Sequence, residues 1–427
     1  MVTSRQWALR SLPTDLRYIE RMTTKNRPTG GVTRRTALTT LSAAVAVTLT
    51  PDLVRGQDGA LADTTKRWGR LPNALGSRSP AENPRRTPSP TSSRTPLQDL
   101  HGTMTPSDLH YERHHAGVPV VDPIAYRLMV HGMVDRPITF TLQDLKRFPV
   151  ATRTCFLECS GNFGGQREDV TPQDLCGLTS QSEWTGVLLS TVFNEVGAQP
   201  RATWFLAEGQ DAAVMTRSIP LKDAVGEAML AYAQNGEALR PEQGYPVRLL
   251  LPGWEGNACV KWLRRIEVGD QPFMTREETS KYTDPLVDGT AREFSLVMDA
   301  RSVITSPSYP QTIEKGFVEL RGVAWSGRGA IRRVDVSTDG GRTWKPATLQ
   351  QPVLPKAHTR FRHAWEWDGR PTEILSRAVD ETGYTQPEMS TLQRVRGRRT
   401  RYHLNPVTGW TIAADGRVRF GLQRMRA

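Results

Sequence analysis

The chain is poor in cysteine and histidine and contains no long apolar run. Its 427 residues include four cysteines and eight histidines. It has no Cys-x-x-Cys pair for zinc and no Cys-x-x-Cys-His motif for covalent haem, so neither group is expected in this chain. No stretch approaches the roughly 20 apolar residues that a membrane-spanning helix needs. We therefore expect no membrane span, and electrons released by any redox reaction would have to pass to a partner.

The charge balance is basic but dispersed. The formal net charge is +12, and the first 62 residues hold nine basic and four acidic side chains, which leaves +7 for the rest. These charges are scattered rather than gathered in an aromatic-rich groove. The pattern favours an anionic small substrate or an acidic partner, and we predict no nucleic-acid partner.

The N-terminus has the pattern of an export leader. Arg34 and Arg35 precede a weakly apolar stretch, and Ala60-Leu61-Ala62 offers a small-x-small cleavage site. This predicts a twin-arginine signal peptide over residues 1–62 and a periplasmic location. The alternative is a short buried helix behind two chance arginines. Because this route exports proteins already folded, the leader favours a bound prosthetic group.

Composition divides the remaining chain into four parts. Residues 63–105 are rich in Pro, Ser and Arg, which predicts a disordered linker. Residues 106–290 mix helical and strand patterns, which predicts an α+β domain. Residues 291–400 hold short strands separated by Gly/Asp turns, which predicts a β-sandwich. Residues 401–427 accompany a basic run that is typical of a solvated tail.

Within the α+β domain the patterns are specific enough to place elements. Alternating polarity in 118–150 predicts two strands, with a short helix or turn over 142–148. Helix-like runs cover 188–197 and 221–235. Apolar strands are expected at 247–251 and 263–268.

One cysteine has an unusual setting, in the stretch RTCFLECSGNFGG (153–165). Cys159 lies where an extended run enters a glycine-rich turn. A thiolate binds metal, and such a turn gives a bulky cofactor a backbone-lined approach to the sulfur. Cys155 has poor geometry for a disulfide with Cys159 and is expected to be buried. Spacing alone leaves two structural disulfides open as an alternative.

Several motifs resemble the sulfite oxidase family of molybdenum enzymes. The matching stretches, in order, are YERHHAGVPVVDPIAYRLMVHG, FLECSGN, SIPLKDAV, LAYAQNGEAL, GYPVRLLLPGWEGNACVKWLRRIEV and VDVSTDGGRTWKPATL. The export leader, the ECSGN variant and the lack of a haem domain are most similar to the SoxC branch, the molybdenum subunits of thiosulfate-oxidising systems. The resemblance implies a sulfite-oxidase-type molybdopterin-binding domain followed by an immunoglobulin-like β-sandwich dimerisation domain, an α+β architecture overall.

The resemblance also assigns roles around the metal. It implies that Cys159 is the protein thiolate on molybdenum, beside the dithiolene sulfurs of a molybdopterin. Arg113, His114 and His115 match positions near the pterin and the mouth of the site, where a guanidinium would orient an oxyanion. A pair of surface imidazoles is the structural alternative for the histidines. Tyr282 matches the family's active-site tyrosine, and is otherwise an ordinary half-buried loop residue.

Further residues match positions that hold the pterin. Arg248 and Lys261 correspond to cations that bind its phosphate and ring, joined by the backbone around Cys259 and Val260. Asp211 matches an acceptor for pterin nitrogens. Cations around a buried phosphate offset their desolvation only when paired, so the cofactor-free protein is expected to be less stable.

Two positions depart from the family pattern. Relatives carry an arginine five residues after the cysteine, where this chain has Gly164, and Arg167 is the nearest replacement. A pterin-contacting histidine is replaced by Gln243, which forms hydrogen bonds but carries no charge. Both changes favour a larger, carrier-bound sulfur substrate over free sulfite.

The resemblance thus implies an exported molybdenum oxidoreductase of sulfite or carrier-bound sulfane sulfur, acting by oxo transfer in thiosulfate oxidation. Arg113, with Arg167, would hold the oxyanion, and Tyr282 would orient the reacting groups. Electrons would pass to a c-type cytochrome, with a homodimer as the core of a heterotetramer and a sulfur-carrier protein or sulfite as substrate.

Two alternatives belong to other classes of function. A nitrate or sulfoxide reductase could use the same scaffold, although such nitrate reductases carry fused haem and flavin domains and the sulfoxide reductases usually lack the second β domain. A metal-free binding or assembly protein could keep the fold without the cofactor.

Overall fold

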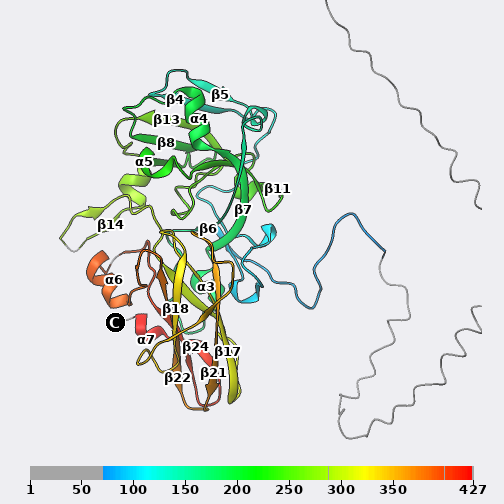
Figure 1. The fold of residues 1–427 in the computed structure, drawn as a ribbon, viewed down its shortest axis with the longest axis vertical. Coiled ribbons are helices and arrows are strands. Elements are labelled where there is room, and N and C mark those ends of the chain that lie inside the picture. The colour runs from blue at the N-terminus through cyan, green and yellow to red at the C-terminus, as the bar shows by residue number, and fades with distance from the viewer. Residues whose placement is uncertain (1–70, 287, 399, 426–427) are drawn as a thin grey trace, which may run out of the picture. The chain divides into compact units, whose positions relative to one another are not determined.

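The computed structural model describes residues 71–286, 288–398 and 400–425 (Figure 1). The predicted signal peptide, residues 1–62, and the first part of the predicted linker lie outside the described residues. Residues 71–77 belong to one compact unit of the chain and residues 78–427 to the other, which holds every described helix and strand. In the described ranges, no helix combines the length and apolar character required to cross a membrane.

Two five-stranded sheets form the first domain. Their strands are β4 (Leu128–Gly132), β5 (Ile138–Phe140), β6 (Val150–Glu158), β7 (Thr179–Leu188), β8 (Trp204–Gly209), β9 (Thr216–Pro220), β10 (Met229–Gln234), β11 (Glu237–Ala238), β12 (Arg248–Leu250) and β13 (Leu263–Gly269). One sheet has the order β11–β10–β7–β6, with β12 also paired to β10. The other has the order β5–β4–β13–β8–β9, in which β4 and β13 are parallel and the other neighbours antiparallel.

Short helices connect these strands. They are α2 (Leu142–Leu145), α3 (Pro172–Cys176), α4 (Leu189–Val196), α5 (Leu221–Ala224) and the 3₁₀ turn η4 (Pro241–Gln243). α2 and α3 each begin after a threonine whose hydroxyl accepts a hydrogen bond from a backbone N–H of the first turn. α4 ends at Gly197, where φ is +67° and glycine is favoured.

Most strand and helix predictions in this domain are confirmed, but one is wrong. The helix expected over 221–235 ends at Ala224, and residues 229–234 form β10. β10 pairs with both β7 and β12 in the interior of a sheet. These tertiary pairings outweigh the helical propensity of the Leu, Ala and Gln residues in the segment.

The predicted linker becomes ordered earlier than expected. Residues 87–113 contain β1 (Thr87–Ser89), β2 (Ser92–Arg94), β3 (Glu112–Arg113) and the 3₁₀ turns η2 (Leu97–Asp99) and η3 (Ser107–Leu109). The Thr95 backbone N–H donates to Gly177 O at 2.8 Å, and the Thr95 hydroxyl donates to Leu109 O at 2.9 Å. Because the domain satisfies these backbone groups, a Pro- and Ser-rich segment can lie against it in one conformation.

The second domain is a β-sandwich, reached through the π-helical turn η5 (Glu277–Lys281) and the hairpin of β14 (Asp284–Pro285) and β15 (Ala291–Arg292). Its strands are β16 (Arg301–Ser306), β17 (Gly316–Trp325), β18 (Ile331–Ser337), β19 (Lys345–Pro346), β20 (Thr348–Leu349), β21 (Thr359–Trp367), β22 (Thr372–Asp380), β23 (Thr408–Ile412) and β24 (Val418–Phe420). One sheet has the order β16–β17–β21–β20 and the other β19–β18–β22–β23–β24. The predicted α+β class and sandwich are confirmed.

The expected C-terminal tail is part of this sandwich. Residues 401–427 include β23, β24 and the short helix α7 (Leu422–Met425), and they follow α6 (Met389–Arg396). Trp410 and Phe420 are each only 1% exposed, and their rings are in edge contact. The prediction of a solvated tail is therefore wrong, because the basic run is followed by apolar residues that complete a sheet.

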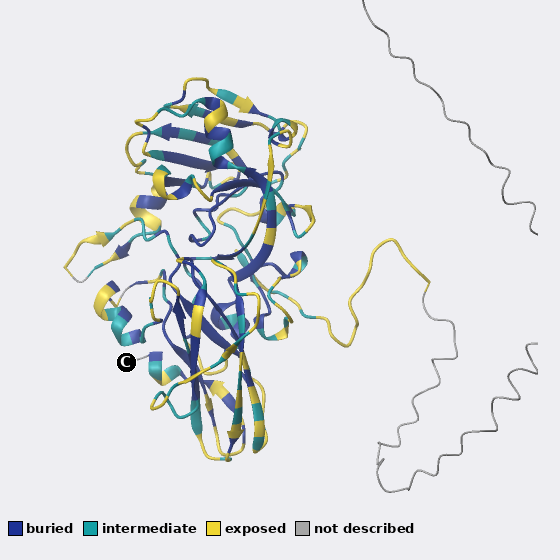
Figure 2. Cartoon of the chain, viewed as in Figure 1, coloured by how far each residue is buried: buried dark blue, intermediate teal, exposed yellow. Residues whose placement is uncertain are grey.

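Residues coloured as buried occur in the strands of both domains, including β6 (Figure 2). The sandwich core includes residues that precede the second domain in sequence, among them Phe156 of β6. The Phe156 ring stacks on His358 with centroids 6.0 Å apart and lies 6.4 Å from the ring of Trp325. β6 thus forms part of both cores, and it also ends at the cysteine turn.

We predict that Phe156→Ala destabilises the whole chain. The side chain is fully buried, so its removal leaves a cavity between the domains that should cost about 3–5 kcal/mol. Val150 of the same strand is 65% exposed, and Val150→Ala should change stability by less than about 0.5 kcal/mol. Urea unfolding of both variants measures the difference. Similar midpoints for the two variants would contradict a shared core at Phe156.

Candidate active site

A cavity lies beside Cys159, and most of the predicted site residues line it. The predicted residues on its wall are Arg113, His114, His115, Cys159, Asp211, Gln243, Arg248, Cys259, Val260, Lys261 and Tyr282. They come from β3 and the residues after it, from the turn after β6, from the loop after β8, from η4, from the β12–β13 region and from the end of η5. The fold therefore brings together motifs that are far apart in sequence.

Backbone hydrogen bonds fix the turn that carries the thiol. The Cys159 N–H donates to Leu178 O at 3.0 Å, and the Asn162 N–H donates to Cys159 O at 2.9 Å. The Gly256 N–H donates to Glu158 O at 2.6 Å. A Cβ at Gly256 would lie 2.7 Å from the Tyr111 hydroxyl oxygen and 2.9 Å from Glu158 O, so a side chain there would push the two segments apart.

The thiol of Cys159 is free. All four cysteines are unpaired, and Cys155, Cys176 and Cys259 are each at most 2% exposed, so the two-disulfide alternative is not realised. Burial raises the pKa of the Cys159 thiol, against a smaller opposing effect of a backbone hydrogen bond from Gly161. The uncoordinated thiol is therefore protonated near neutral pH, and metal binding there would release the proton.

Two cations, the buried Arg248 and the half-buried Lys261, line the same cavity as this thiol. Arg248 donates to Gln243 O and to Cys259 O, both at 3.0 Å. Lys261 Nζ lies 3.0 Å from Arg113 O and 3.0 Å from Glu242 O. Neither cation forms an ion pair with a carboxylate among the described residues. Burial, and then the charge of Arg248, lower the pKa of Lys261 to about 7.

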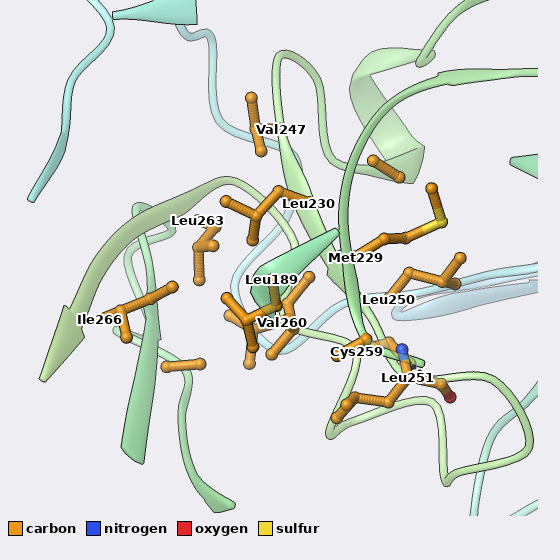
Figure 3. Close-up of a cluster of buried hydrophobic side chains, with 14 of the residues drawn as sticks. Leu189, Met229, Leu230, Val247, Leu250, Leu251, Cys259, Val260, Leu263 and Ile266 are labelled. Atoms are coloured by element: carbon orange, nitrogen blue, oxygen red, sulfur yellow. Dashed lines mark hydrogen bonds between the residues drawn. The ribbon is translucent and has the colours of Figure 1, made fainter. Parts of the chain in front are cut away.

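Cys259 and Val260 contribute by position rather than through their side chains. Figure 3 shows both side chains within a cluster of buried apolar residues. The Cys259 Sγ accepts a hydrogen bond from the Leu251 N–H at 3.3 Å, and Val260 O accepts one from the Leu249 N–H at 2.9 Å. This packing holds the segment before Lys261 rigidly against β12.

The mouth of the cavity combines a guanidinium, an imidazole and a phenol. Tyr282 Oη lies 3.0 Å from His115 Nε2, and Arg113 donates to the carbonyl oxygens of Thr91 and His114. Burial raises the pKa of Tyr282. Burial also lowers the pKa of His115, and the charge of Arg113 lowers it further. The phenol thus keeps its proton while the imidazole stays neutral near pH 7, a combination that can donate to an anion without adding charge.

One residue that supports the site from behind the cavity wall was not identified from the sequence. Arg217 of β9 is 1% exposed; its Nη1 lies 2.9 Å from Glu255 Oε1 and its Nε lies 2.8 Å from Glu278 Oε1. Its guanidinium lies 5.1 Å from the centre of the Tyr282 ring. Burial alone would raise the pKa of Glu255, but the charge of Arg217 and the hydrogen bond from His403 lower it to about 2. The available signal was a charged residue directly before the matching stretch SIPLKDAV.

Arg167 is not at the site. It does not line the cavity, its side chain is 66% exposed, and its Nε lies 3.4 Å from Asp169 Oδ1. A Cβ at Gly164 would lie 2.2 Å from Asp174 O, so the backbone leaves no room for a side chain at that position. The prediction that Arg167 replaces the missing arginine is therefore wrong.

The described residues fit a molybdopterin better than a metal held by protein alone. No group of three His, Cys, Asp or Glu side chains in the described ranges is arranged to hold a metal ion. A metal at Cys159 must therefore bring its other ligands with it. Arg248 Nε and Asn257 Oδ1 are buried on the cavity wall without a hydrogen-bond partner in the described structure. A phosphate and a pterin ring would supply an acceptor and donors to such atoms.

Comparisons with known proteins agree with this geometry. The model of the oxidoreductase molybdopterin binding domain matches residues 115–277, and that of the Mo-co oxidoreductase dimerisation domain matches residues 292–409. Sulfite oxidase from Gallus gallus is 33% identical over 314 residues, which cover 67% of this chain and 68% of that protein. Mitochondrial sulfite oxidase from Rattus norvegicus is 33% identical over 316 residues, 67% of this chain but only 57% of the rat protein.

A solved structure gives a similar result at higher identity. The crystal structure of the sulfane dehydrogenase SoxCD from Paracoccus pantotrophus matches with a TM-score of 0.81 and 44% sequence identity, covering 84% of this chain and 97% of that chain. Both the fold and the order of the domains are therefore those of this group of proteins.

We predict that sulfate stabilises the cofactor-free protein more at pH 6 than at pH 8. The pKa of Lys261 is about 7, so the side chain is charged at pH 6 and loses its proton as pH rises. Loss of one charged hydrogen-bond donor should weaken sulfate binding about tenfold. Sulfate-dependent shifts in Tm at the two pH values measure the effect, since sulfate itself does not titrate in this range.

Lys261→Gln provides the control for this experiment. The variant should retain part of the sulfate effect through Arg248 but lose its pH dependence. An equal dependence in the variant and the wild type would show that another group is responsible.

Proposed function

Because the chain belongs to the sulfite oxidase family of molybdopterin oxidoreductases, we propose that it is an exported molybdenum-dependent dehydrogenase of reduced sulfur. Its preferred substrate in this proposal is carrier-bound sulfane sulfur of thiosulfate oxidation, with free sulfite second. The main support is one juxtaposition: the free thiol of Cys159 shares a cavity with the buried Arg248 and the half-buried Lys261, and neither cation has a carboxylate partner among the described residues.

Each of these residues has a distinct task. When bound, the molybdenum cofactor supplies oxygen-atom transfer and accepts two electrons. Cys159 would hold the metal, while Arg248 and Lys261 would hold the phosphate of the pterin through charge-assisted hydrogen bonds. Asp211 and Gln243, both on the cavity wall, complete the polar contacts to the ring.

The residues at the mouth of the cavity position the substrate. Arg113 attracts the anionic substrate and orients it, and the protonated Tyr282 hydroxyl donates a hydrogen bond to the developing negative charge. Arg217 lies against the face of the Tyr282 ring and restricts its movement. A rigid donor is effective because little reorganisation is needed when charge develops on the substrate.

The preference for a carrier-bound substrate rests on position 164, which is a glycine in this chain. No arginine occupies that position, and the exposed Arg167 does not replace it. One fewer cation lowers the affinity for a small, highly charged anion such as sulfite. The 44% identity with a protein named as a sulfane dehydrogenase supports the same choice.

The acceptor and the assembly follow from the same proposal. A c-type cytochrome would take the electrons one at a time near the cavity mouth. The match to a dimerisation domain supports a homodimer, and the likeness to SoxCD supports a further subunit bound to each copy. Export by the twin-arginine route rests on the leader-like sequence alone.

We predict that Cys159→Ser removes both molybdenum and activity. Loss of the Cys159 thiol, the proposed ligand of the metal, should lower turnover by at least about 100-fold. Molybdenum content and cytochrome reduction are measured on the purified holoprotein, with sulfite and with a thiosulfonated carrier as separate substrates. If the wild type folds but binds no molybdenum, the result would favour the alternative that the chain is a metal-free binding protein. Equal turnover of both substrates would contradict the preference for the carrier-bound substrate.

We predict that Tyr282→Phe lowers kcat about 100-fold and leaves molybdenum content unchanged, because one donor to the developing charge is lost. Tyr384, whose hydroxyl lies 3.2 Å from Asn405 Nδ2 in the sandwich domain, offers a matched control. Tyr384→Phe should keep kcat within about twofold of the wild type. Equal effects of the two substitutions would argue against a role of the Tyr282 hydroxyl.

A further inference from the structure

A buried carboxylate directly precedes the cysteine and binds to the sandwich domain. Glu158 is the last residue of β6 and is 0% exposed. Its Oε1 lies 2.9 Å from Arg301 Nη1 of β16, and its Oε2 accepts a hydrogen bond from Trp325 Nε1 of β17 at 2.7 Å. Asn162, on the other side of the turn, donates to Oε1 at 3.0 Å through its side-chain amide.

Arg301 extends this connection across the turn. Its guanidinium donates to the backbone oxygen of Asn162 and to that of Leu404. The guanidinium also lies 5.9 Å from the centre of the Trp325 ring. The side chains of Arg301 and Glu158 are 3% and 1% exposed, so this set of bonds is shielded from water.

These bonds hold the chain on both sides of Cys159. Glu158 and Asn162 stand at the two ends of Cys159-Ser160-Gly161, and Arg301 binds the side chain of one and the backbone of the other. The position of the Cys159 sulfur follows from the backbone between these anchors. A buried ion pair gives little net stability compared with apolar residues of similar size, so stability alone is a poor reason for one here. Directional bonds, in contrast, fix geometry.

We propose that Glu158 and Arg301 are positioning residues that aim the Cys159 sulfur into the cavity. The sandwich domain is thereby part of the active site in addition to its role in dimer formation. This inference rests on the proposed function of Cys159 as the metal ligand. Neither residue touches the substrate, and both act through the turn.

Glu158→Gln is the most conservative test. The substitution keeps the shape of the side chain but places an amide N–H₂ group opposite the donors of Arg301, Asn162 or Trp325. In the cofactor-free protein, alkylation of Cys159 by iodoacetamide should become roughly tenfold faster, because the turn opens more often. In the holoprotein, affinity for molybdenum should fall about 10- to 100-fold, and the sulfur-to-molybdenum charge-transfer band should shift.

Asp335→Asn separates positioning from simple loss of stability. Asp335 is 6% exposed and pairs with Arg333 and Arg377 within the sandwich, away from the cavity. This control should lower Tm without changing the alkylation rate or the absorption band. If Arg301→Gln fails to fold because Glu158 is left as an unpaired charge, the double variant E158Q/R301Q removes both charges and should show the same changes as E158Q.

The outcomes distinguish this inference from the proposed function. If E158Q lowers Tm but leaves the alkylation rate and the band as in Asp335→Asn, the ion pair is only structural and the inference is overturned. If the wild type binds no molybdenum, the proposed function fails, while the alkylation rates of the cofactor-free proteins still decide whether Glu158 holds the thiol in place.

Discussion

The site depends on holding one sulfur at the edge of an open space while everything around it is tightly packed. A strand end can do this only if the turn after it is anchored on all sides. Leu178, Gly256 and Arg301 bind its backbone from three different parts of the chain. Close backbone approach at Gly256 keeps the neighbouring wall near without closing the cavity. Rigidity of the turn and space beside it are therefore consequences of the same packing.

The positive charges on the wall of this cavity exceed the negative charges paired with them, and this imbalance predicts an anionic ligand. Arg248 is buried and Lys261 is half-buried, and neither has a carboxylate partner in the described structure, whereas Arg217 is buried with two. The first pair carries an uncompensated desolvation cost that an anionic ligand would offset. Arg217 is already neutralised and serves as a rigid support under Tyr282. The difference separates ligand-binding cations from structural ones without any knowledge of the ligand.

Sequence reasoning was most successful where a local motif carries the chemistry. The glycine-rich turn at Cys159 and the cations at positions 113, 248 and 261 could be found because each lies in a recognisable stretch, and the cavity brings them together. Arg167 was misplaced because its proximity in sequence to Gly164 says nothing about the direction of a side chain after a tight turn. Arg217 and Arg301 were missed because their partners are distant in sequence. The strand at 229–234 was misread because its pairing is tertiary.

The largest difference from the sequence prediction concerns the C-terminal segment, and it has a consequence for how the site forms. The segment 400–405 was expected in or near a solvated tail, yet the His403 N–H donates to Ser160 O at 2.8 Å and the Tyr402 ring lies 5.2 Å from that of Tyr282. His403 Nε2 also lies 3.2 Å from Glu255 Oε2. Composition predicts domains from stretches of similar residues. In this protein, however, residues that follow most of the sandwich strands in sequence contact the active site of the first domain. The cavity can reach its final geometry only after the C-terminal segment has docked, because contacts with that segment fix the cysteine turn and the network beneath Tyr282.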